Sequence, residues 1–69
     1  MIKVEELINT DSDENSYKIR AFADTKSEVT TGATYVGLPK GATIEMGSTI
    51  TTASGDIGFM KSDGTWNWV

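Results

Sequence analysis

The sequence predicts a small all-β fold: an antiparallel meander of about five or six strands forming a compact sandwich or a partly open barrel. Two consecutive β-hairpins in the last third of the chain carry this prediction. Strand-like runs at 43–52, 56–61 and 65–69 are separated by short turns at 53–55 and 62–64. The runs are rich in β-branched and aromatic residues, and each turn holds a glycine that can adopt the positive φ of a tight hairpin.

The first eight residues fit two patterns. Ile2, Val4 and Ile8 would share one face of a strand, whereas Val4, Leu7 and Ile8 would share one face of a helix. We favour the strand.

The segment 17–21 alternates cleanly between apolar and charged residues, which is typical of a strand with one buried face. Tyr17, Ile19 and Ala21 are expected to point into the core. Phe22 then falls on the charged face. Either a bulge intervenes, or this second face is covered as well, for example by another subunit.

The middle of the chain predicts turns and one short strand. Thr25 and Glu28 have capping-box spacing, but no helical apolar periodicity follows them, so no helix is expected there. A strand over 33–38 should end at a turn that contains Pro39. Gly47, inside an otherwise strand-like run, indicates a bulge or a close backbone approach.

The length of 69 residues predicts a single β domain, residues 1–69. A chain of this size buries only about 60% of the surface that its unfolded state exposes. The sequence has no cysteine for a disulfide and no histidine. Oligomerisation is therefore the expected extra source of stability, and a homo-oligomer is predicted.

The formal net charge of −4 argues against a phosphate-binding surface, so nucleic acid is not an expected partner. No cationic segment precedes an apolar one at the start. No apolar run approaches the roughly 20 residues that cross a bilayer, so the chain is expected to be soluble, without a membrane partner.

Trp66 and Trp68 are the most conspicuous candidate site residues. Two positions apart on a predicted strand, they should face the same side, and Asn67 the other. Such a pair could stack on a sugar, but a domain this small needs the apolar area for its core or a subunit interface. Phe22, Trp66 and Trp68 are therefore the candidate interface residues.

A calcium loop is the nearest match to a metal site. The run 11–15 offers oxygen ligands at loop positions 1, 3 and 5. However, Ser16 stands where the loop needs glycine, and Phe22 stands where it needs a bidentate glutamate. We expect an acidic turn without a metal.

No catalytic residues and no cofactor site are predicted. The acidic pairs Glu5–Glu6 and Asp24/Glu28 are expected to be surface charges, because no apolar residues bracket them into a pocket. A serine nucleophile would have only Lys61 as a nearby amine and lacks a glycine-flanked turn. The chain is not expected to be an enzyme.

The second half resembles small structural proteins of tailed bacteriophages, and among these the head-fibre and related capsid-associated proteins. The resemblance lies in the runs 34–48, 55–57 and 61–66, which combine a Gly-Ser-Thr strand with an Asp-Gly-Thr-Trp turn. It implies a non-enzymatic protein of the virion that assembles as a homo-oligomer, for example a trimer, and docks on the capsid or another virion protein. The alternative is a small β-type binding module, for example for carbohydrate, that uses the Trp66/Trp68 face.

Overall fold

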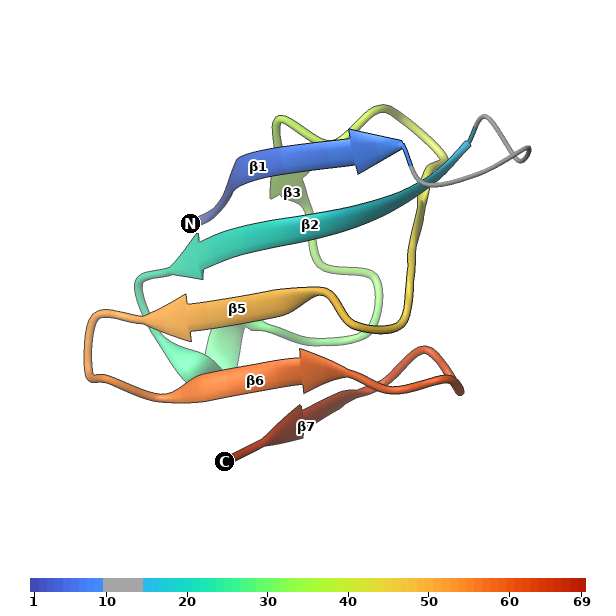
Figure 1. Ribbon diagram of the computed structural model, residues 1–69. Coiled ribbons are helices and arrows are strands. Elements are labelled where there is room, and N and C mark those ends of the chain that lie inside the picture. Colours follow the sequence, from blue (N-terminus) through green and yellow to red (C-terminus); the bar gives the residue numbers. More distant parts are fainter. Residues whose placement is uncertain (10–14) are drawn as a thin grey trace.

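The computed structural model describes residues 1–9 and 15–69, and their strands form one mixed sheet (Figure 1). The strands of these residues are β1 (Ile2–Asn9), β2 (Ser16–Ala23), β3 (Tyr35–Val36), β4 (Thr43–Ile44), β5 (Thr49–Thr52), β6 (Ile57–Met60) and β7 (Trp66–Trp68). Their order is β3-β1-β2-β5-β6-β7, and β4 also pairs with β2. The all-β prediction is confirmed, and the described sheet does not close into a barrel.

The two predicted hairpins are present. β5 pairs antiparallel with β6, and β6 pairs antiparallel with β7. Their turns place Gly55 and Gly64 at φ of 94° and 85°, the left-handed region that favours glycine. The opening segment is a strand, as favoured, and pairs antiparallel with β2.

The sheet is not the wholly antiparallel meander that the sequence predicts. β2 runs parallel to β5, with Arg20 opposite Thr49 and Ala23 opposite Thr52. β1 and β3 are also parallel, as are β2 and β4. The reason is the crossover segment, residues 24–48, which returns the chain to the start of β2 and so makes the next long strand run in the same direction.

The predicted strand over 43–52 is divided into β4 and β5 by a turn. Gly47 lies in this turn at φ 93°. A Cβ atom there would lie 3.2 Å from Cε of Lys18. Gly47 was expected inside a strand, at a bulge or a close backbone approach, but it lies in a turn, and the atoms close to it belong to the end of the Lys18 side chain. The turn separates two strands that both pair with β2.

The prediction that no helix follows Thr25 is wrong by a single turn. Lys26–Glu28 forms the 3-10 turn η1. The backbone N–H of Thr25 donates to the Glu28 carboxylate at 2.8 Å. The capping-box hydrogen bond thus forms although no helical apolar periodicity follows it. A single 3-10 turn is too short to need such a pattern.

The core lies between the sheet and the crossover segment, which passes behind the sheet in Figure 1. Ile19 and Ala21 are buried on the inner face of β2, as the alternation predicts, and the same cluster contains Ile50. Partly buried side chains of the crossover, including Val29 and Leu38, pack against it. One face of the sheet is thus covered, while side chains on the other face meet solvent.

Ser48 connects the core to the gap between β4 and β5. Its side chain is fully buried, and its Oγ accepts the backbone N–H of Ile19 at 2.8 Å. This hydroxyl takes the place of a strand partner where β2 faces neither β4 nor β5.

Replacing Ser48 by alanine is expected to lower the free energy of unfolding by about 1–3 kcal/mol, because the buried N–H of Ile19 would lose its acceptor. Urea titration followed by circular dichroism measures the change. Ser54→Ala, in the exposed turn between β5 and β6, is the matched control. Equal midpoints for the two variants would contradict this role of Ser48.

Candidate functional site

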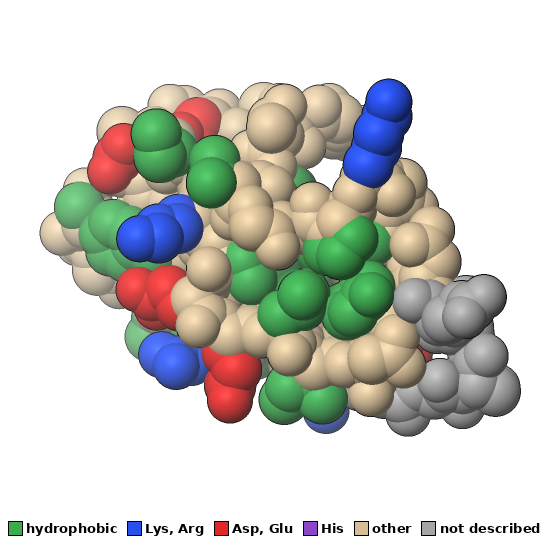
Figure 2. All heavy atoms as spheres, turned by 90° about the horizontal axis from the view of Figure 1, so that it is seen from above, with side chains coloured by type: hydrophobic (Ala, Val, Ile, Leu, Met, Phe, Trp, Pro, Cys, Tyr) green, Lys and Arg blue, Asp and Glu red, His purple; other side chains and the backbone are tan. Residues whose placement is uncertain are grey.

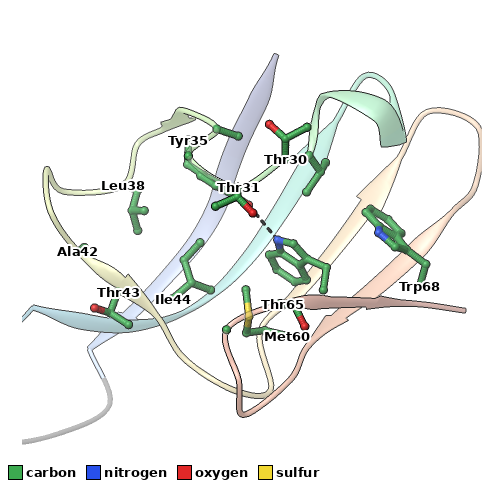
Figure 3. Close-up of a pocket in the computed structure, with 15 residues that line it drawn as sticks. Thr30, Thr31, Tyr35, Leu38, Ala42, Thr43, Ile44, Met60, Thr65 and Trp68 are labelled. Atoms are coloured by element: carbon green, nitrogen blue, oxygen red, sulfur yellow. Dashed lines mark hydrogen bonds between the residues drawn. The ribbon is translucent and has the colours of Figure 1, made fainter.

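Two aromatic side chains link the ends of the open sheet on its inner face. The indole Nε1 of Trp66, on β7, donates a hydrogen bond to the phenol oxygen of Tyr35, on β3, at 2.9 Å (dashed line in Figure 3). Strands β3 and β7 are the two ends of the strand order. The inner face is therefore curved into a concave surface, with Trp66 and Tyr35 in contact across it.

This concave surface contains a groove of about 540 Å³. Its lining combines three aromatic residues with hydroxyls and aliphatic side chains (Figure 3): Tyr35, Trp66 and Trp68; Thr30, Thr31, Thr43 and Thr65; Leu38, Ile44 and Met60. All of its described lining residues are uncharged. The groove therefore suits a neutral ligand, and the lining holds no carboxylate or amine for proton transfer.

Trp68 occupies a position that a glycine makes possible. A Cβ atom on Gly58, the residue opposite in β6, would lie 3.1 Å from Cε3 of the indole and 3.0 Å from Cγ2 of Ile50. Lys26 adds a cation–π contact, with Nζ 5.2 Å from the ring centroid. The ring is thus held by contacts from β5, β6 and η1.

Trp66 and Trp68 share the inner face of β7, as predicted, and Asn67 is exposed. Both indoles are partly buried and pack against the core of their own chain. Core packing, one of the two uses foreseen for them, is therefore observed.

Burial raises the pKa of Tyr35 above that of a free tyrosine, although the hydrogen bond from Trp66 opposes this shift. The folded state therefore holds the phenol proton more tightly than the unfolded state. The contribution of the protonated phenol to the free energy of unfolding is therefore fully present below the ordinary tyrosine pKa. It should be lost as the pH rises from there through the raised pKa of Tyr35.

Absorbance of the tyrosinate band tests this prediction in Tyr17→Phe, where Tyr35 is the only tyrosine left. The titration midpoint of Tyr35 should lie at a higher pH than that of N-acetyltyrosinamide. The melting temperature should fall as the pH rises through the same range. A midpoint equal to that of the free amide would show that the groove does not shield Tyr35.

The outer face of the sheet carries a second set of apolar side chains. The exposed fractions of Ile57 and Phe59 are 42% and 43%, and Val69 is also exposed beside Ile57. Phe22 lies on this face in the row that runs through Thr51 to Ile57. Its side chain is half-buried.

Phe22 therefore faces away from Trp66 and Trp68, and the three predicted interface residues do not form one site. No bulge accounts for Phe22, since the register shift lies in β1 between Val4 and Glu6. Sequence reasoning missed Ile57 and Phe59. The available signal was Gly58 and Met60 at alternate positions, which marks the opposite face as the inner one.

A third apolar region lies along β1 and β3. Figure 2 shows hydrophobic side chains gathered on the side of the molecule where these strands lie. The exposed large apolar residues of the two strands are Leu7, Ile8 and Val36.

The predicted surface carboxylates lie in ion pairs, and all of them except the half-buried Glu28 are exposed. Asp24 and Glu28 both bind the amino group of Met1. This amino group, together with the Thr25 amide, lowers the pKa of Glu28. Glu5 and Glu6 bind Arg20, each at 3.5 Å. These contacts are between surface charges, as expected.

Most of the candidate calcium loop, residues 11–14, lies outside the described residues. Asn15 is described, and its side-chain amide donates to the carbonyl of Gly41 at 2.8 Å. Within the described residues, no cluster of three or more acidic side chains could hold a metal ion.

In the described ranges 1–9 and 15–69, no helix has the length and apolar character needed to cross a membrane. No protein-family model matches the chain, and neither the curated proteins nor the solved structures contain a match.

Proposed function

We propose that this protein is a non-enzymatic structural protein of a phage virion, associated with the capsid as a head-fibre or decoration protein. The observation that supports an assembly role is the outer face of the sheet. It presents Phe22 from β2 and both Ile57 and Phe59 from β6, the two strands that flank β5, and the crossover segment covers the opposite face.

A rigid sheet face of this kind suits contact with another protein. Its backbone is held by strand pairing, so no loop has to be ordered when a partner covers it. Each apolar side chain removed from water contributes about 25 cal/mol per Å² of buried area. Such a face can supply binding energy without a pocket.

The phage part of the proposal rests on the sequence resemblance. The resembling runs 34–48, 55–57 and 61–66 cover β3, β4 and parts of the two C-terminal hairpins. The capsid or another virion protein would be the partner, and the virion the location.

Particles purified from cells that carry the gene in its natural genome test this function. Mass spectrometry should find the chain in the particles. Phe59→Ser should reduce its incorporation, whereas Thr51→Ser, on the same face, should not. Particles without the chain, or a genome that yields no particles, would contradict the proposal.

The groove favours a second candidate function, binding of a neutral carbohydrate. Partly buried tryptophans beside four threonine hydroxyls offer both stacking and hydrogen bonding. Calorimetry with neutral tetrasaccharides of glucose and of N-acetylglucosamine is the test. Binding that Trp68→Phe weakens would support this function, and no heat at millimolar sugar would contradict it.

A further inference from the structure

The outer edge of β7 presents backbone groups that no described strand pairs with. Two bonds fix the phase of the β6–β7 ladder: Lys61 N–H to Thr65 O and Val69 N–H to Ile57 O, both 2.8 Å. Hydrogen-bonded pairs alternate along an antiparallel ladder, so Asn67 bonds toward β6. The N–H and C=O groups of Trp66 and Trp68 therefore point to the free edge.

The opposite side of the sheet carries devices that discourage edge pairing. Strand β3 has only two residues. The part of β1 beyond β3 contains a register shift between Val4 and Glu6, and its glutamates are paired with Arg20. Short edges, bulges and charges all discourage the addition of another strand.

Strand β7 is also short, but its hydrogen bonds to β6 extend from Thr65 to Val69, so its edge is longer than that of β3, and it has neither a bulge nor a charge. The segment 65–69 contains no charged side chain, no proline and no register shift against β6. Of the described edges, it is the one whose chemistry permits strand addition.

We propose that β7 pairs antiparallel with β7 of a second copy across a two-fold axis. Asn67 would lie opposite Asn67 of the second copy at the axis, and Trp66 opposite Trp68. Each Trp66–Trp68 pair then exchanges both of its N–H···O=C bonds, which uses the backbone groups left free at this edge. The inference deepens the proposed function and rests on it, since it names a partner and a surface for assembly.

The side chains of β7 suit a second copy in this register. Trp66 and Trp68 lie on the same face, so the pairing places indoles opposite each other as cross-strand aromatic pairs. Although each chain carries a net charge of −4, the side chains of the paired segments are uncharged and do not repel. A two-fold interface is self-complementary and uses the β7 edge of both copies. The remaining edge, formed by β1 and β3, disfavours strand addition, so assembly through strand edges would end at the dimer.

Asn67 offers a test that leaves the core untouched, because its side chain is exposed on the outer face. Sedimentation velocity on the full chain should show a species of twice the chain mass. Asn67→Lys and Asn67→Asp would each place like charges together at the axis and should weaken the dimer at least about tenfold. Mixing the two variants should restore it as a heterodimer.

Thr51→Lys and Thr51→Asp are the matched controls, with the same charges on the same face two strands away. They should keep the wild-type dimer, and all four variants should melt like the wild type at a concentration where every chain is monomeric.

A wild-type chain that stays monomeric to millimolar concentration would overturn edge pairing. So would an oligomer that survives both Asn67 variants, although assembly through another surface, and with it the proposed function, would then stand. Conversely, a charge-reversible dimer whose chain is absent from virions would overturn the virion function and leave the edge pairing intact.

Discussion

Ile50→Ala is expected to lower the free energy of unfolding by about 2–5 kcal/mol. Ile50 is fully buried at the centre of the sheet, and its Cγ2 contacts the inner side of β6 at Gly58. Alanine would leave a cavity in the core on the inner face of the sheet, which strand pairing keeps from collapsing. For a chain of this length the total stability is roughly 3–10 kcal/mol, so much of the protein would unfold. Urea titration measures the loss.

Ile57→Ala is the matched control, because it removes the same atoms from a side chain that is 42% exposed on the outer face. It should cost well under half as much as Ile50→Ala. Similar losses at the two positions would mean that the two faces of the sheet are buried alike, contrary to the arrangement described above.

Trp68→Ala is expected to cost about 3 kcal/mol, the lower end of the range for large aromatic truncations, since the indole is only partly buried. Its removal would uncover Gly58, over which the indole lies. The contact with Lys26 would also be lost. Thermal melts followed by circular dichroism provide the measurement.

Trp68→Phe separates size from aromaticity, because it keeps a ring over Gly58 and should recover part of the loss. Asn67→Ala, on the exposed side of the same strand, should change the melt little. If Trp68→Ala instead melted like the wild type and lost affinity for a neutral tetrasaccharide, the carbohydrate function would replace the assembly function.

The local parts of the fold could be predicted because short-range chemistry decides them. Gly55 and Gly64 take the backbone conformations that hairpin turns demand. The alternation along β2 buries Ile19 and Ala21, since a strand turns successive side chains to opposite faces. Neither result depends on how distant segments meet.

The candidate site could be predicted only in part. That Trp66 and Trp68 share a face follows from strand geometry alone. That Phe22 lies on the other face follows from the alternation of β2, but whether the two faces would be covered depended on where the crossover segment packs. The groove could not be predicted, because it depends on the contact between Trp66 and Tyr35, which are 31 residues apart.

The sequence by itself determined the all-β character, the C-terminal hairpins and the direction of side chains along each strand, because nearest-neighbour sterics and periodicity control these. Only the tertiary structure decided the parallel pairing of β2 with β5, the division of the 43–52 segment, and the join between them through Ser48 and Ile19. Those features depend on hydrogen-bonding groups that are far apart in the chain, such as the Ile19 N–H and the Ser48 hydroxyl that accepts it, 29 residues away. Any strand edge can offer such bonds, so no local pattern specifies which partner is chosen.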